Sequence, residues 1–258
     1  MKGFIFDLDG TIYVDDEMIE GAADAIHRLK SRGDRVIFLT NKSIARRTDY
    51  VEKLKMLGVD TTLDEVISSN FITAKYLKDS MKPGDAAYVI GEEPLFDELA
   101  EENIHIAKDP RLASHVVIGW DRKFDYDKLN IAFQAWRNGA KIIATNPDRT
   151  CPVKEGELPD CGAMIGAIEG ATGETVTMII GKPSHLMASY VLDQVLRLPA
   201  ENVYMVGDRL ETDIRMGNEA GMNSVLVLTG ITDSSMLERT VDRPKYTLSS
   251  VKDIDQIE

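Results

Sequence analysis

Phe4-Ile5-Phe6-Asp7-Leu8-Asp9-Gly10-Thr11 is the stretch that decides the fold. Its apolar start predicts a buried strand, and the Asp-Gly pair predicts a turn directly after that strand. Side chains two residues apart in a strand point to the same side, so Asp7 and Asp9 should project together. Two carboxylates this close favour a bound cation, acid–base chemistry or both, because they cannot both ionise cheaply alone. A surface turn is the alternative interpretation.

The composition limits the classes of partner. The 258 residues are 43% hydrophobic and 28% charged, which suits one large globular domain or two smaller ones. The net charge of -13 argues against nucleic acid and anionic membranes as partners, although a metal and local cations could still hold an anionic substrate. Cys151 and Cys161 make no disulfide framework. Without a recognisable signal peptide or membrane span, we expect a cytoplasmic protein.

Short apolar runs alternate with helical patterns, which predicts an α/β fold with parallel strands. Helices are expected at Ala22–Lys30 and Tyr50–Leu57, each followed by a glycine that can end it. The predicted strands are Gly3–Asp7, Arg35–Leu39, Glu65–Ser68, Ala87–Ile90, His115–Ile118, Lys141–Ala144, Thr177–Ile180, Val203–Val206 and Ser224–Leu228.

Two changes in composition divide the chain. Polar turns near Ser80–Asp85 and Gly170–Glu174 flank a segment with its own strands and a helix at Asp127–Asn138. We therefore expect a core of residues 1–80 and 179–258, interrupted by a smaller α/β unit at 81–178. The core should be a Rossmann-like sheet of about five parallel strands.

Polar residues follow four of the predicted core strands. Ligands of open parallel sheets bind outside the carboxyl ends of the strands, so these residues should converge. Carboxylates, a hydroxyl and a lysine suit phosphoryl transfer, in which a carboxylate attacks phosphorus and Mg2+ offsets the negative charge. The residues in question are Asp7 and Asp9, Thr40 and Asn41, Lys182, and Asp208 and Asp213.

These motifs resemble those of a known superfamily. Asp7-Leu8-Asp9-Gly10-Thr11, Thr40-Asn41, Gly181-Lys182-Pro183-Ser184 and Gly207-Asp208 with Thr212-Asp213 are similar to the four motifs of the haloacid dehalogenase (HAD) superfamily. The later stretches Tyr88–Glu93, Ala144–Asp148 and Gly162–Ile168 resemble its NagD-type, p-nitrophenylphosphatase-like members. The resemblance implies a HAD-like core with an inserted α/β cap domain of type IIA.

The resemblance also implies roles for the core residues. Asp7 would be the nucleophile and a metal ligand, and Asp9 the general acid and base, with its backbone carbonyl on Mg2+. Lys182 would neutralise Asp7 and the phosphoryl oxygens. Thr40 and the Asn41 backbone would bind the phosphoryl group, Asp208 would be the second carboxylate on Mg2+, and Asp213 would support the metal. Asp213 could equally be a charge in the first turn of a helix.

Other polar residues have two interpretations. Asn146 and Asp148 follow a cap strand, and family resemblance makes them substrate-binding residues, although both could be turn formers. Lys42 stands where NagD-type relatives often have Asn, and we expect it to be solvated rather than beside the phosphate site. Arg46-Arg47 should form an exposed helix face.

The expected function is that of a Mg2+-dependent phosphatase of small phosphorylated metabolites. Sugar phosphates and nucleoside monophosphates are the candidate substrates, with p-nitrophenyl phosphate as an in vitro substrate. A phosphomutase and a non-catalytic phosphate-binding protein are the alternatives. A homodimer is possible because related caps sometimes dimerise.

Overall fold

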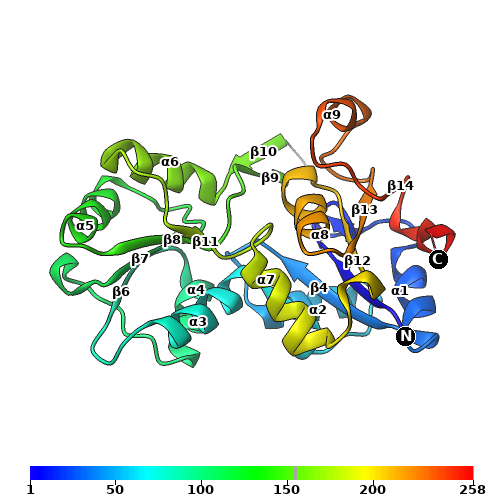
Figure 1. The fold of residues 1–258 in the computed structure, drawn as a ribbon, viewed down its shortest axis with the longest axis horizontal. Helices are drawn as coiled ribbons and strands as arrows, with labels where there is room; N and C mark the ends of the chain where they lie inside the picture. The colour runs from blue at the N-terminus through cyan, green and yellow to red at the C-terminus, as the bar shows by residue number, and fades with distance from the viewer. Residues whose placement is uncertain (154–155, 258) are drawn as a thin grey trace.

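The computed structural model describes residues 1–153 and 156–257, and Figure 1 shows two sheets side by side within these ranges. The larger sheet has six parallel strands in the order β14-β13-β12-β1-β4-β5. Their bounds are β1 Gly3–Phe6, β4 Arg35–Thr40, β5 Val66–Ser68, β12 Val203–Gly207, β13 Asn223–Val227 and β14 Tyr246–Leu248.

β1 lies inside this core sheet and is buried on both faces. Phe4 and Phe6 pack on one side against the helices α1 (Ala22–Ser31) and α2 (Arg47–Met56). Ile5 points to the other side, where the helical segments α7 (His185–Ser189) and η3 (Tyr190–Leu196) cover the sheet. A strand buried on both faces needs a continuous apolar run, which explains the start of the chain.

The smaller sheet belongs to the inserted cap and has the parallel order β11-β8-β7-β6. One face packs on α5 and α6, and the other on α3 and α4. An antiparallel pair, β9 with β10, extends from the cap toward the core in Figure 1. The bounds are β6 Ala87–Ile90, β7 His115–Ile118, β8 Lys141–Ala144, β9 Thr150–Val153, β10 Gly156–Pro159, β11 Met178–Ile179, α3 Ser69–Ser80, α4 Glu93–Glu101, α5 Tyr126–Arg137 and α6 Cys161–Thr172.

Two expectations about the core sheet are wrong. The run that ends in Ile180 was expected in the core, but β11 pairs with β8 of the cap, Met178 opposite Ile143. β14 adds a sixth strand to the expected five, pairing with β13 through Tyr246 opposite Val225. Its short run Tyr246-Thr247-Leu248 carries too little apolar pattern to be recognised alone. The division into 1–80, 81–178 and 179–258 remains our proposal, with β11 across its second boundary.

The remaining elements are short; η2 packs against α5 in the cap and the others lie around the core sheet. None of the helices within the described ranges is long and apolar enough to cross a membrane. The remaining bounds are β2 Tyr13–Val14, β3 Glu17–Met18, η1 Leu63–Glu65, η2 Pro110–Leu112, η4 Ala200–Asn202, η5 Leu210–Ile214, α8 Arg215–Glu219, α9 Ser234–Arg239 and η6 Val251–Ile257.

Candidate active site

Three parallel strands place polar residues at one edge of the core sheet. β1 is followed by Asp7, β4 ends at Thr40, and β12 is followed by Asp208. All three side chains are buried. Because β1 pairs with both β4 and β12 in parallel, the carboxyl ends of these strands meet, as expected for a ligand site in an open sheet.

Lys182 lies at the centre of this edge. Its Nζ atom contacts the Asp7 carboxylate and lies 2.8 Å from Oδ1 of Asp213. Only 3% of the Lys182 side chain is exposed. Burial alone would lower the pKa of Lys182, but the carboxylates of Asp213 and Asp7 outweigh it and raise that pKa. The lysine therefore stays charged and neutralises part of an acidic cluster.

Three buried carboxylates form a group that fits a divalent cation. One oxygen from each of Asp7, Asp208 and Asp213 lies within 4.8 Å of the others. Burial, and next the Asp213 carboxylate, raise the pKa of Asp208 to about 7. Burial also raises the pKa of Asp7, against the opposing effect of Lys182. Oδ1 of Asp208 has no hydrogen-bond partner among the described residues, so a hard cation with oxygen ligands such as Mg2+ suits this group.

Two glycines make the carboxylate group possible. Gly10 has φ +84°, and a Cβ atom there would lie 2.6 Å from Oδ2 of Asp208. A Cβ atom on Gly207 would lie 2.3 Å from the Asp213 side chain. Only glycine leaves room for both carboxylates to approach the end of β1.

Asp9 stands apart from this carboxylate group. Its Oδ1 atom lies 3.1 Å from Nζ of Lys42, whose side chain is 26% exposed. The expectation that Lys42 is solvated is therefore wrong, because its ammonium group is held beside Asp9 at the mouth of the site. The Asp9 side chain remains 17% exposed, so it can reach a leaving group.

The loop after β4 is tied to Lys182 and to the cap. The Asn41 side chain brackets the Lys182 backbone, since its Oδ1 accepts from Lys182 N at 2.8 Å and its Nδ2 donates to Lys182 O at 3.1 Å. Asn146 is buried and donates from Nδ2 to Asn41 O at 2.9 Å. Its Oδ1 also accepts from the backbone N–H of Asp148 at 3.0 Å, a contact typical of a turn former.

The cap closes the site with Asp148, which the sequence analysis named, and with Thr150, Cys151 and Asp160, which it did not. Asp148, Thr150, Cys151 and Asp160 line the cavity from the cap, opposite Asp7, Asp9 and Lys182. Burial, reinforced by the Asp148 charge, raises the pKa of Asp160 to about 7. Burial likewise raises the pKa of Asp148, against Arg209. A buried carboxyl group can accept hydrogen bonds from the hydroxyl groups of a ligand, and in its protonated form it can also donate one.

Arg209 is a further residue that the sequence analysis did not name, and it joins the core to the cap. Its Nη2 donates to Thr150 O in β9 at 2.9 Å, and its backbone N–H donates to Oδ2 of Asp213 at 3.1 Å. Its position next to Asp208 was the available signal in the sequence. The prediction of an exposed Arg46-Arg47 face is wrong for Arg47, which pairs with Glu98 of the cap at 2.9 Å with only 11% of its side chain exposed, whereas the Arg46 side chain is 42% exposed.

The cavity at the site measures about 30 Å3. A cavity of that size has room for only about two water molecules, since one needs roughly 10–15 Å3 on the same measure. The cap therefore lies closed over the site in this structure. A parallel core sheet with buried carboxylates and a lysine at its carboxyl edge, closed by an α/β cap, defines the class of capped α/β phosphotransfer hydrolases.

Comparison with known proteins agrees with that class. Residues 4–105 match the family described as haloacid dehalogenase-like hydrolase, and residues 179–254 match a HAD-hydrolase-like family. The sugar-phosphatase AraL of Bacillus subtilis is 38% identical over 255 residues, covering 99% of this chain and 92% of that protein. An acid sugar phosphatase of Staphylococcus haemolyticus is 35% identical, covering 97% and 94%.

Solved structures agree as well. The 4-nitrophenylphosphatase of Thermotoga maritima superposes with a TM-score of 0.92 at 36% identity, covering 99% of this chain and 97% of that one. NagD from Escherichia coli K-12 superposes with a TM-score of 0.89 at 31% identity, covering 99% and 98%. The chain belongs to the haloacid dehalogenase-like hydrolases and is NagD-like. It is a phosphoric monoester hydrolase, which sets aside the non-catalytic alternative.

Proposed function

We propose that the chain is a Mg2+-dependent phosphatase of small sugar phosphates that works through an aspartyl-phosphate on Asp7. The observation that carries the proposal is the contact of Lys182 with both Asp7 and Asp213 in a buried cavity under the cap. The Lys182 ammonium favours the charged form of the Asp7 carboxylate against the effect of burial, and its positive charge attracts an anionic phosphoryl group.

The proposed first step transfers the phosphoryl group to the enzyme. An Asp7 oxygen forms a bond to phosphorus while the bond from phosphorus to the ester oxygen breaks, and Asp9 gives its proton to that oxygen. Lys182, Thr40 and the Asn41 backbone would hold the phosphoryl oxygens. The Lys42 ammonium, 3.1 Å from Asp9, keeps the Asp9 side chain at the mouth of the cavity.

The proposed second step returns Asp7 to its free form. Asp9, now charged, takes a proton from a water molecule whose oxygen bonds to phosphorus. The acyl-phosphate bond breaks, inorganic phosphate leaves, and Asp9 is protonated again. When bound, Mg2+ supplies positive charge that offsets the repulsion between the phosphoryl group and the carboxylates. Asp7, Asp208 and Asp213, with the backbone carbonyl of Asp9, would hold the ion.

Cap movement is part of this proposal. The cavity of about 30 Å3 leaves no room for a sugar, so substrates must enter while the cap is displaced. Arg209 of the core donates to Thr150 O of the cap at 2.9 Å. This contact would form when the cap closes and would place the Arg209 side chain at the active site. Closure around a bound substrate would exclude bulk water and strengthen the electrostatic contacts.

The cap groups favour a hydroxylated leaving group over a nucleobase. Asp148, Thr150 and Asp160 supply polar groups that can bond to sugar hydroxyls. Among the described residues that line the cavity there is no aromatic ring on which a base could stack. Sugar phosphates are therefore preferred over nucleoside monophosphates, in line with the names of the two sugar phosphatases compared above.

The phosphomutase alternative differs in its product. A mutase would return an isomerised sugar phosphate, whereas a phosphatase releases inorganic phosphate. The exposed fraction of the Asp9 side chain supports delivery of water, and hence hydrolysis.

Two buried cysteines without a disulfide in the described structure suit a reducing compartment such as the cytoplasm. A homodimer stays a prediction.

The test is phosphate release from p-nitrophenyl phosphate, sugar phosphates and nucleoside monophosphates, with Mg2+ and with EDTA. We expect Mg2+-dependent release that is greatest for sugar phosphates. Asp7→Asn should lower turnover by roughly 10³-fold or more, while Asp24→Asn on the exposed face of α1 should not. Isomerised product without phosphate would support the mutase, and full turnover by Asp7→Asn would remove the nucleophile assignment.

A further inference from the structure

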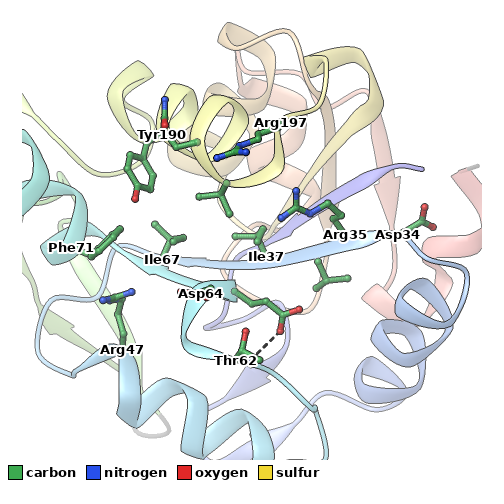
Figure 2. Close-up of a pocket in the computed structure, with 14 residues that line it drawn as sticks. Asp34, Arg35, Ile37, Arg47, Thr62, Asp64, Ile67, Phe71, Tyr190 and Arg197 are labelled. Atoms are coloured by element: carbon green, nitrogen blue, oxygen red, sulfur yellow. Dashed lines mark hydrogen bonds between the residues drawn. The ribbon is translucent and has the colours of Figure 1, made fainter.

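A second groove lies away from the active site, at the amino-terminal ends of the core strands. It has a volume of about 640 Å3, within the usual range for small-molecule sites. Ile37 and Ile67 form part of its lining, and Figure 2 shows Phe71 and Tyr190 together at one end. Arg35, at the start of β4, lies at the other end of the groove in Figure 2, whereas the active site begins where β4 ends.

The groove follows from the topology of the chain. In a doubly wound sheet the helix after an edge strand usually returns across the sheet. Here α3 follows the edge strand β5 but packs its Ala74 and Leu77 into the cap. Ile37 and Ile67 are themselves almost fully buried, and the groove lies above them between the start of α3 and η3.

Arg197 is held in an unusual backbone conformation at this groove. Its φ of 54° lies in the left-handed region, which costs an ordinary side chain about 1 kcal/mol and which glycine or asparagine adopts more easily. Its guanidinium projects over the groove beside Tyr190 and Arg35 in Figure 2. The left-handed backbone is explained by its place at the end of η3, where the Arg197 N–H donates to Leu192 O, so only the projecting guanidinium offers a group to a ligand.

The charges around the groove leave Arg197 available to an anion. The acidic side chains nearby are already engaged or solvated: Asp34 accepts from Lys2 N at 2.9 Å, and Glu65 pairs with Lys30 at 2.8 Å. Asp64 is exposed at the rim, as Arg35 and Arg197 are, so water screens all three charges. Arg35 donates to Leu196 O at 2.7 Å and retains other N–H groups on its guanidinium.

The aromatic end of the groove suits a planar ring. Phe71 and Tyr190 meet edge to face, with ring centroids 5.6 Å apart. Arg47 stacks on Phe71, with 3.9 Å between its guanidinium carbon and the ring centroid. Nζ of Lys75 also lies 5.2 Å from the Phe71 ring centroid, so a base would lie against the exposed part of this aromatic and guanidinium cluster and not on a bare Phe71 ring. At the other end of the groove, the paired N–H groups of an arginine guanidinium can donate to two oxygens of one phosphate group.

We propose that this groove is a second binding site for a nucleotide, with its base against Phe71 and Tyr190 and its phosphates on Arg197 and Arg35. The site is coupled to the cap because Arg47, part of the same wall, pairs with Glu98 of α4 at 2.9 Å. Both of these side chains are nearly buried, so a ligand that moves Arg47 alters a contact that holds the cap.

Binding is tested on the full chain by calorimetry with ADP in EDTA, which needs no catalysis. Arg197→Gly should weaken ADP binding by roughly tenfold or more, yet keep or raise the melting temperature because it relieves the backbone. Asn103→Gly relieves a similar φ of 59° in the cap and should leave ADP binding unchanged. Arg197→Lys keeps the positive charge but loses the paired N–H groups of the guanidinium. Its affinity for ADP should therefore lie between those of the wild type and Arg197→Gly.

Coupling is tested with p-nitrophenyl phosphate at saturating concentration and Mg2+. ADP should change kcat of the wild type and of Asn103→Gly, but not of Arg197→Gly. Equal ADP affinity in the wild type and Arg197→Gly, or inhibition that saturating substrate abolishes in every variant, would overturn the site. ADP binding that depends on Arg197 in a protein without phosphatase activity would instead refute the proposed function and leave the groove assignment standing.

Discussion

Nζ of Lys182 lies 2.8 Å from Oδ1 of Asp213, and both side chains are almost fully buried. Asp213 is thus more than a helix charge, since it shares Lys182 with Asp7 and lies within the carboxylate group. Removing one partner of a buried ion pair leaves the other charge without compensation, which commonly costs ~3–5 kcal/mol. The balance of charge around Asp7 therefore depends on Asp213.

Asp213→Asn should lower kcat by roughly 10²-fold while the protein stays folded. Without the Asp213 charge, Lys182 should bind Asp7 more strongly, which makes Asp7 less available for its proposed role as nucleophile. The measurement is kcat with p-nitrophenyl phosphate at saturating Mg2+, together with the melting temperature. Asp24→Asn, an exposed change of the same chemistry in α1, is the control. Wild-type kcat in Asp213→Asn would show that the pair with Lys182 has no catalytic consequence.

Lys42→Asn should reduce kcat by about tenfold and change the melting temperature little. The ammonium group that holds Asp9 at 3.1 Å is partly exposed, so its loss disturbs the position of Asp9 more than the stability of the fold. Substrates with good leaving groups need less help from a general acid. The loss should therefore be smaller for p-nitrophenyl phosphate than for a sugar phosphate. Lys55→Asn, on an exposed part of α2, serves as control, and equal losses for both substrates would argue against a role through Asp9.

Mg2+ should stabilise the protein more at high pH than at low pH. The pKa of Asp208 is raised from 3.8 to about 7, so the folded protein binds more protons than the unfolded chain between these values. Stability of the metal-free protein should therefore fall as pH rises through this window. At lower pH, protons compete with Mg2+ for the Asp208 carboxylate. Saturating Mg2+ should therefore raise the melting temperature by roughly 5–10 °C at about pH 8 and by little at about pH 5.

Thermal unfolding with Mg2+ or EDTA across this pH range is the measurement. Asp208→Asn should abolish the pH-dependent gain, because an amide neither titrates here nor balances the ion. A gain in the wild type that is the same at every pH would contradict the assignment of Asp208 as a ligand.

Gly10→Ala should destabilise the protein and remove the stabilisation by Mg2+. The new Cβ atom would lie 2.6 Å from Oδ2 of Asp208, in a backbone conformation with φ +84°. Gly33→Ala is a matched control, because φ is +81° there and nothing lies within 4 Å of the new atom. The control should lose only the ~1 kcal/mol of left-handed strain and keep its response to Mg2+. Equal behaviour of the two variants would show that the approach to Asp208 is unimportant.

The sequence predicted much of the fold from local pattern. The apolar run at Phe4–Phe6, bounded by Asp7 and Gly10, could only be stable as a strand buried on both faces. The alternation with helices then required parallel strands, and parallel strands bring their carboxyl ends together. The helix expected at Tyr50–Leu57 begins earlier, at Arg47, because Asp49 accepts from Arg46 N at 2.8 Å and starts the first turn.

The sequence pattern of a strand does not identify the strands that pair with it. The run at Met178–Ile179 is equally compatible with either sheet, and only its pairing with β8 decides that it belongs to the cap. The strand at Tyr246–Leu248 is recognisable only beside β13. Hydrophobic periodicity reports how a segment is buried and does not report its neighbour.

Sequence by itself determined the type of chemistry, because Asp7, Asp9, Lys182 and Asp208 follow apolar strands that must be buried in parallel order. Tertiary structure alone decided the side-chain partners: Lys42 with Asp9, Arg209 with Thr150, and Arg47 with Glu98. Each of these contacts joins residues far apart in the chain, most of them across the boundary between core and cap. Long polar side chains take their place from the packing of whole elements, which local sequence cannot specify.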